Sequence, residues 1–310
     1  MEMRWHLFKL VIMIFLTAGT FSLFIAIALG LLQKPSKPAD PSSAPTPPTL
    51  LAGLTGQGVK VAVLDSGVAF EHPDFERRLQ PGYNALDPSR PPLDDFGHGT
   101  PVTGVIFAQD NGFGVTGVAP DVQLFPVKVL DRYGEGDIDA VVRGLDWCIA
   151  NGIHIVNMSF AVPEPDDRLH AAIRRAYDAG IVLVAAAENT FGGAPGYPAS
   201  YEEVISVTAV DADKKPYRGA PKGKIDFAAR GVDILSTSTD GGYERYSGTS
   251  IAAPRVTGWI ARILQKPEAF DVETDNPGRL HVSVYEALRQ MAEDLGEPGP
   301  DEVFGAGWIG

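Results

Sequence analysis

From residue 59 onward, the chain alternates between short apolar runs rich in β-branched residues and longer stretches in which apolar residues recur at helical spacing. A near-continuous apolar run is typical of a strand that is buried on both faces within a parallel sheet. The pattern therefore predicts buried strands at residues 59–64, 122–129, 153–158, 181–187 and 204–210.

Two intervening stretches, residues 137–150 and 167–179, have the helical spacing and begin at an aspartate, which suits the positive end of a helix dipole. Gly152 and Gly180 follow them as stop signals. Strands and helices in alternation predict right-handed crossovers. The expected fold class is α/β, a three-layer sandwich with a mainly parallel sheet covered by helices on both faces. Ligands of such sheets gather at the carboxyl ends of the strands.

The first 50 residues have a different pattern. Residues 1–9 form a short tail, and residues 10–32 carry no charge over 23 positions, enough for a helix to cross a hydrocarbon core of about 30 Å. Residues 33–50 are rich in proline, which prevents helix and sheet from propagating. We therefore expect a transmembrane or signal-anchor helix at 10–32, a linker at 33–50 and a folded domain at 51–310.

Two alternatives stay open for residues 10–32. The run follows the basic residues Arg4 and Lys9 and contains Ala26 and Ala28, a candidate A-x-A site for cleavage of a signal peptide. A helix buried in the fold is the second alternative. The basic residues on the two sides of the run are nearly balanced, so the orientation rests on the resemblance to a signal peptide, which favours export of the domain.

Charge and cysteine content narrow the class of protein. The chain has 26 Lys and Arg against 39 Asp and Glu, a formal net charge of −13, with no cluster of basic residues. Such a field repels phosphate backbones, so nucleic acid is not an expected partner. Cys148 is the single cysteine, which excludes an intrachain disulfide. Its apolar helical surroundings predict a small buried hydrophobe rather than a nucleophile.

Three segments combine a reactive side chain with neighbouring glycines. VAVLDSGV places Asp65 at the end of the first strand, DDFGHGT places His98 between two glycines, and YSGTSIAAP places Ser250 at the start of an apolar helix. Each residue alone fits a turn, an exposed loop or a helix N-cap. Together they supply the carboxylate, imidazole and hydroxyl of an acyl-transfer triad.

With these residues in the order Asp, His, Ser, the domain resembles the subtilisin-like serine proteases (subtilases) over nearly all of residues 55–310. In IVLVAAAENT, Asn189 matches the family's oxyanion asparagine. The sequence departs from the family pattern at Pro101, where histidine is usual, and at Ala161 and Glu188, where glycine is usual. None of these changes removes a catalytic residue. The resemblance implies as catalytic residues Asp65, His98, Ser250 and Asn189.

Further matches imply how a substrate lies. VKVLDRYGEGD and VNMSFA resemble the two family strands that flank an extended peptide, and Gly196 lies in the segment that closes the pocket for the residue before the scissile bond. Glu188 borders the same pocket, and its charge favours a basic residue there. The implied substrate-binding residues are Gly134, Glu135, Gly136, Ser159, Phe160, Ala161, Glu188 and Gly196.

The resemblance also implies a structural Ca²⁺, because the loop 109–115 matches in length and pattern the family loop that wraps this ion. Calcium takes six to eight oxygen ligands, several of which a tight loop supplies through its carbonyls. The implied ligands are the side chains of Asp74 and Asn111 and the carbonyls of Gln109, Phe113 and Val115. A bare Asn-Gly turn beside a solvated Asp74 is the alternative.

The expected function is that of a serine endopeptidase acting on polypeptides outside the cytoplasm. The protein is expected at the cell membrane as a single-pass protein, or secreted after signal cleavage. A catalytically silent peptide-binding module of the same fold is one alternative, and an ester hydrolase with the same triad is another. The two strands that flank a peptide favour peptide over ester, and the intact set of catalytic residues favours an enzyme.

Overall fold

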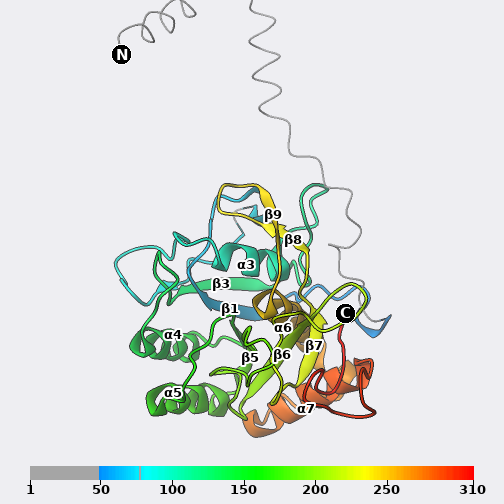
Figure 1. The fold of residues 1–310 in the computed structure, drawn as a ribbon. Helices are drawn as coiled ribbons and strands as arrows, with labels where there is room; N and C mark the ends of the chain where they lie inside the picture. Colours follow the sequence, from blue (N-terminus) through cyan, green and yellow to red (C-terminus); the bar gives the residue numbers. More distant parts are fainter. Residues whose placement is uncertain (1–48, 77) are drawn as a thin grey trace, which may run out of the picture. The chain divides into compact units, whose positions relative to one another are not determined.

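A seven-stranded, wholly parallel sheet forms the centre of the computed structural model, which describes residues 49–76 and 78–310 (Figure 1). The strand order is β2-β3-β1-β4-β5-β6-β7. Parallel neighbours require crossovers, and α-helices supply three of the six connections between consecutive strands of the sheet. The strands are β1 (Lys60–Asp65), β2 (Tyr83–Asn84), β3 (Gln123–Lys128), β4 (Ile155–Met158), β5 (Val182–Ala186), β6 (Val204–Val210) and β7 (Phe227–Arg230).

All five predicted strands are present, and their ends differ from the prediction by at most two residues. The two edge strands were not predicted, because neither has a long β-branched run: β2 has two residues and β7 reads FAAR. Strands β8 (Ile234–Thr237) and β9 (Tyr243–Tyr246) form a separate antiparallel pair, and β8 packs on the helix of residues Gly99–Phe107, α3.

Helices cover both faces of the sheet. The helices α4 (Ile138–Ala150) and α5 (Asp167–Asp178) lie side by side on one face, as Figure 1 shows, and α3 (Gly99–Phe107) and α6 (Thr249–Gln265) pack together on the other. A last helix, α7 (Pro277–Met291), contacts α5 and α6. The predicted α/β three-layer sandwich is confirmed. Short 3-10 turns lie at Thr49–Leu51, Pro73–Phe75 and Pro267–Phe270.

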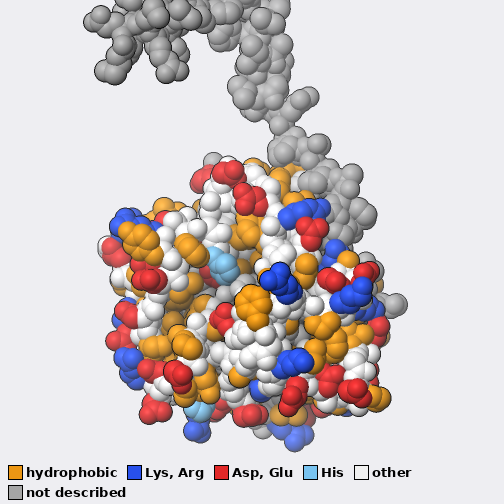
Figure 2. Space-filling model, viewed as in Figure 1, with side chains coloured by type: hydrophobic (Ala, Val, Ile, Leu, Met, Phe, Trp, Pro, Cys, Tyr) orange, Lys and Arg blue, Asp and Glu red, His pale blue; other side chains and the backbone are white. Residues whose placement is uncertain are grey.

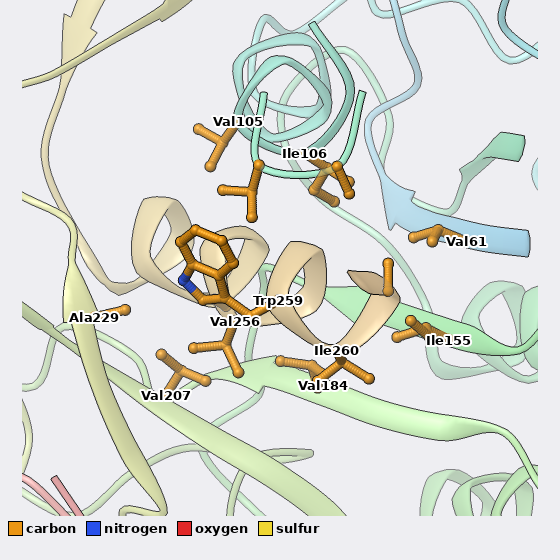
Figure 3. Close-up of a cluster of buried hydrophobic side chains, with 14 of the residues drawn as sticks. Val61, Val105, Ile106, Ile155, Val184, Val207, Ala229, Val256, Trp259 and Ile260 are labelled. Carbon is orange, nitrogen blue, oxygen red and sulfur yellow. The ribbon is translucent and has the colours of Figure 1, made fainter. Parts of the chain in front are cut away.

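The core on the α6 side is apolar and close-packed. Trp259 of α6 is fully buried and lies with Val256 and Ile260 between the sheet and α3, close to Val105 and Val207 (Figure 3). A helix enclosed in this way is apolar around most of its circumference, so it lacks the one-sided pattern of a surface helix. Its position between sheet and α3 holds its first residues rigidly at one end of the sheet.

The free edge of β7 is covered by residues 307–309. The Ala228 N–H donates to the Gly307 carbonyl (2.9 Å), and the Ile309 N–H donates to the Ala228 carbonyl (2.8 Å). Trp308, between them, exchanges two backbone hydrogen bonds with Glu293 (2.8 and 2.9 Å). The edge strand is therefore not left with a row of unpaired backbone groups.

The predicted membrane segment, residues 10–32, and most of the linker, 33–50, lie outside the described residues. Within residues 49–76 and 78–310, none of the helices has both the length and the apolar character that a membrane crossing requires.

Candidate active site

Two predicted catalytic residues and one predicted substrate-binding residue lie at the carboxyl ends of three neighbouring strands. Asp65 is the last residue of β1, Ser159 follows the end of β4, and Asn189 comes shortly after β5. These strands are adjacent in the order β1-β4-β5. His98 directly precedes α3 and Ser250 is the second residue of α6, so two helix starts meet this edge of the sheet. Figure 2 shows a histidine side chain within a hollow near the centre of one face.

Asp65 and His98 form a close pair. The Nδ1 atom of His98 lies 2.9 Å and 3.0 Å from the two carboxylate oxygens of Asp65. The Asp65 carboxylate is fully buried and also accepts the Ser66 N–H (2.7 Å). The negative charge of Asp65, more than that of Asp94, raises the pKa of His98 above its usual value, although desolvation acts against it. The pair therefore favours an imidazole that binds a proton readily.

Asp94, which the sequence analysis missed, organises the segment that carries His98. Its carboxylate accepts the hydroxyl of Ser66 (2.8 Å), the N–H of Gly97 (2.7 Å), and both the N–H (2.9 Å) and hydroxyl (2.6 Å) of Thr100. It thereby caps the first turn of α3, where His98 itself makes no side-chain cap. The available signal was an acidic residue shortly before a helix start. Pro101 fits the same first turn, because backbone N–H groups there have no partner within the helix.

The hydroxyl of Ser250 points at the backbone of Ser159. It donates to the Ser159 carbonyl (3.1 Å), and the Ser159 hydroxyl donates to the Ser250 carbonyl (3.0 Å). The latter carbonyl lacks its usual helical partner, because Pro254 stands four residues on and has no N–H. The expected hydrogen bond from Ser250 to His98 is not among those of the described residues.

Beneath Ser159, a buried polar chain fixes this contact. The Asn157 amide donates to the Ser159 hydroxyl (3.0 Å), and the Thr257 hydroxyl donates to the Asn157 side-chain oxygen (2.9 Å). All three side chains are buried. The sequence analysis assigned no role to Asn157 and Thr257. The two residues are 100 positions apart in the chain, so nothing in the sequence shows that they form a hydrogen bond with each other.

Asn189 is oriented by the start of α6. Its side-chain oxygen accepts the Thr249 N–H at 3.3 Å, with the Thr249 hydroxyl at 3.5 Å. This orientation leaves the amide nitrogen of Asn189 as the donor group. Asn189 is half-buried at the same edge as Ser250, one residue beyond Thr249.

The residues predicted to line the substrate pocket come together. Val162 and Tyr197 exchange backbone hydrogen bonds (2.7 and 2.9 Å), which draws the segment after β4 against Gly196. A Cβ atom placed on Gly196 would lie 2.8 Å from the Ala161 methyl and 3.8 Å from the Glu188 Cβ. Ala161, Glu188 and Gly196 therefore lie close together, with Ala161 in the tighter contact.

The other predicted bank, residues 134–136, lies at the surface. Glu135 and Gly136 are exposed, and the turn is held by Asp131, whose carboxylate accepts the N–H groups of Tyr133 (2.8 Å) and Glu135 (3.0 Å). The ring of Phe96 lies against Gly134, where a Cβ atom would come within 2.6 Å of it. Only glycine fits at position 134, which also has a left-handed φ of 76°.

Asp74 and the loop 109–115 meet as the calcium prediction requires. The Asp74 carboxylate is fully buried, and its Oδ2 accepts the Val115 N–H (2.9 Å). The Tyr243 hydroxyl and the Asn111 amide lie beside this carboxylate and interact with it as side-chain donors, although the Asp74 Oδ1 has no hydrogen bond of good geometry among the described residues. Burial raises the pKa of Asp74 above its usual value. Of these groups only the carboxylate oxygen could be a cation ligand, because the Asn111 amide nitrogen and the Tyr243 hydroxyl act here as donors.

The outcome for the other predicted ligands is mixed. The Gln109 carbonyl accepts the Asn111 N–H (3.0 Å), and the Gln109 side chain is bound to Arg78 and to the carbonyls of Phe107 and Pro120. The Asn111 side-chain oxygen accepts the Phe113 N–H (3.3 Å). The described residues contain no group of three or more His, Cys, Asp or Glu side chains that could hold a metal. Any ion here would depend largely on carbonyl and amide oxygens.

Cys148 is fully buried in α4, and burial raises the pKa of its thiol. A protonated thiol enclosed in the core is no rival to Ser250 as a nucleophile.

A buried carboxylate paired with an imidazole, next to a serine at a helix start, is the arrangement of serine hydrolases that use acyl transfer. Comparison with known proteins identifies the class more closely. The model of the Subtilase family matches residues 56–307, and the chain belongs to this family. It is a subtilisin-like serine endopeptidase.

Several curated relatives support this assignment. The chain is 38% identical over 260 residues to Minor extracellular protease Epr of Bacillus subtilis (strain 168), a match that covers 83% of this chain and 38% of Epr. It is 37% identical over 258 residues to Subtilisin Savinase of Lederbergia lenta, covering 83% of this chain and 90% of Savinase. The chain thus spans well under half of Epr but nearly all of Savinase.

Proposed function

We propose that Asp65, His98, Ser250 and Asn189 carry out the hydrolysis of peptide bonds. The close contact between the buried Asp65 carboxylate and His98 Nδ1 is the observation that carries the proposal. It holds the imidazole in the tautomer whose Nε2 is free to accept a proton, and it stabilises the imidazolium that results. A protein that only bound peptides would not need this pair.

In the proposed reaction, the Ser250 hydroxyl turns from the Ser159 carbonyl toward His98, transfers its proton to Nε2 and attacks the scissile carbonyl carbon. The Asn189 amide and the Ser250 N–H stabilise the oxyanion of the tetrahedral intermediate. His98 then gives the proton to the departing amine as the acyl-enzyme forms. Water, activated by the same imidazole, hydrolyses the ester and restores Ser250.

The substrate in this proposal is an extended polypeptide that lies between residues 134–136 and 159–161. Both segments end or follow strands at the active-site edge, where exposed backbone groups pair with a peptide regardless of its sequence. Main-chain pairing of this kind favours peptides over simple esters.

Replacement of Ser250 by alanine tests the assignment. We expect Ser250→Ala to fold normally, to lose measurable peptidase activity and to lose labelling by a fluorophosphonate probe. Ser247→Ala is the matched control, because Ser247 is exposed and lies three residues before the nucleophile. Wild-type protein that folds but neither reacts with the probe nor cleaves casein would be a silent peptide-binding module. Retained turnover in Ser250→Ala would contradict the triad.

We propose further that Asp74 and the loop 109–115 hold a structural Ca²⁺. The fully buried Asp74 carboxylate, which contacts this loop at Val115, supports the ion. Bound Ca²⁺ stabilises the folded state by RT ln(1 + [L]/Kd), so the melting temperature of an inactive Ser250→Ala background should be higher in calcium than in chelator. Asp74→Asn should remove most of this difference, whereas Glu76→Gln, on an exposed neighbour, should keep it. A melting temperature that ignores calcium in both proteins would rule the site out.

We propose that the catalytic domain works outside the cytoplasm, held there by residues 10–32, with cleavage of that segment and secretion as the alternative. The uncharged run and the extracellular relative Epr support export. A protease added to intact cells should digest the Ser250→Ala domain, and a cytoplasmic control protein should survive. Protection of both would contradict export. The mass of the mature amino terminus separates an anchor from a cleaved signal.

A further inference from the structure

We propose that Glu188 selects a cationic side chain, lysine or arginine, in the substrate residue that precedes the scissile bond. This inference rests on the proposed function and adds a substrate class to it.

The position of Glu188 follows from the geometry of the reaction. In the proposed reaction, the carbonyl under attack by Ser250 has its oxygen at the Asn189 amide. The side chain of the same substrate residue is attached to the Cα atom next to that carbonyl carbon. Its neighbours must then be the residues that flank Asn189 and Ser159. Glu188 directly precedes Asn189, and Ser159 accepts the hydroxyl of the nucleophile itself.

The backbone of Glu188 is unusual and sets the direction of its side chain. Its φ is 81°, a left-handed conformation that costs a residue other than glycine free energy and persists mainly at functional sites. The backbone on either side is tied down, since the Ala187 N–H donates to the Val207 carbonyl (3.0 Å) and Asn189 is held by Thr249. With this φ, the Glu188 Cβ faces Gly196 and the space beside it.

The carboxylate of Glu188 is half-buried and has no ion pair within residues 49–76 and 78–310. Its one recorded hydrogen bond runs from the Asn189 N–H to Oε1 (3.1 Å). The second carboxylate oxygen is therefore available to a ligand. A half-buried carboxylate binds a cation more strongly than an exposed one does, because water screens the pair less.

The shape of the space also favours a long, thin side chain. A Cβ atom on Gly196 would lie only 2.8 Å from the Ala161 methyl, so these two residues pack closely and leave little room between them for a bulky substrate side chain. An aromatic ring would need depth there. An unbranched lysine chain can lie along the opening with its ammonium group at the carboxylate.

Glu188 has a structural alternative, in which its only task is to accept the Asn189 N–H. Two substitutions separate the roles. Glu188→Gln keeps the size and the acceptor oxygen but removes the charge. Glu188→Gly removes the side chain and suits the left-handed backbone. Glu202→Gln, an exposed glutamate away from the cleft, is the control for loss of one negative charge.

The experiment measures kcat/KM for three peptides that differ only in having Lys, Leu or Phe before the scissile bond, and takes the Lys/Leu ratio for each enzyme. We expect Glu188→Gln to lower the ratio about five- to tenfold, and Glu202→Gln to leave it unchanged. Glu188→Gly should lower it as well and raise cleavage of the Phe peptide, because it widens the pocket.

An unchanged Lys/Leu ratio in Glu188→Gln would overturn the inference, even if Glu188→Gly altered it, because bulk and not charge would then decide. Fluorophosphonate labelling of Ser250 keeps this failure apart from that of the proposed function. A wild-type protein that is labelled and cleaves peptides without any dependence on Glu188 leaves the endopeptidase assignment intact. A wild-type protein that the probe does not label would instead contradict the proposed endopeptidase function.

Discussion

The two helical layers of the molecule differ in how far water reaches them. On one face of the sheet, every residue of α3 and most of α6 are buried. On the other face, α5 buries only four of its residues and presents the rest to solvent, where Arg175 pairs with Asp146 of α4. One layer is enclosed on all sides, and the other is a surface layer with a single apolar stripe.

The enclosed layer carries two of the proposed catalytic residues. His98 and Ser250 stand at the first turns of α3 and α6, so their backbones are fixed by helices that cannot shift without disturbing the core. Even polar groups of this layer are bonded internally, as where the Thr237 hydroxyl donates to the Thr100 carbonyl (2.9 Å). Burial on all sides thus provides the positional precision that a triad needs.

The largest expected effect concerns the core of the enclosed layer. Trp259→Ala should lower the free energy of unfolding by about 3–5 kcal/mol, because it removes a fully buried indole and leaves a cavity. Trp147 of α4 is half-buried and stacks on Tyr83 of β2. Trp147→Ala should therefore lower the free energy of unfolding by clearly less. Chemical denaturation in a Ser250→Ala background, which prevents self-digestion, measures both. Equal losses would remove the contrast between the layers.

The second effect concerns the oxyanion donor. Asn189→Ala should lower kcat by about 10²–10³, the range already established for such a donor in subtilisin, with little change in KM. The reason is that the amide serves the transition state more than the bound substrate. Steady-state kinetics on a peptide substrate provide the measurement. An effect on KM alone would place Asn189 in substrate binding instead.

A smaller effect is expected on the pH profile. His98 must be neutral to accept a proton, so activity rises with pH through its raised pKa. Asp94 contributes to the raised pKa of His98. Asp94→Asn should therefore lower the pKa of His98 and move the acid limb of the kcat/KM profile to lower pH. Asp87→Asn, at an exposed turn, should leave the limb in place. If the acid limb of the kcat/KM profile stays at the same pH while the maximal kcat/KM falls, Asp94 acts only by holding the first turn of α3 in place.

The smallest effect belongs to the surface layer. Arg175→Ala removes an ion pair with Asp146 in which both side chains are about half exposed. The free energy of unfolding should change by no more than about 0.5 kcal/mol at physiological salt, because water and ions screen the pair. A loss of several kcal/mol would mean that α4 and α5 depend on charge as the other layer depends on packing.

The same contrast explains what the sequence could predict. Periodicity located α4 and α5, since a half-exposed helix alternates apolar and polar faces. It did not locate α3 or α6: a helix at α6 was expected only from the motif around Ser250, and no helix was expected at α3. The triad residues carry their own signatures, whereas Asn157, Asp94 and Thr257 act through contacts with distant segments and look ordinary in sequence. Strand β7 was missed because alanines carry little β signal.

The strip of residues 307–309 along β7 has a consequence for a protease that meets other copies of itself. Trimming of these few residues would strip the Ala228 N–H and carbonyl of their partners and open a strand edge to the solvent. An open edge is a template onto which another chain can add its own strand. Damage far from Ser250 would then be seen first as self-association, while the catalytic residues themselves remained in place.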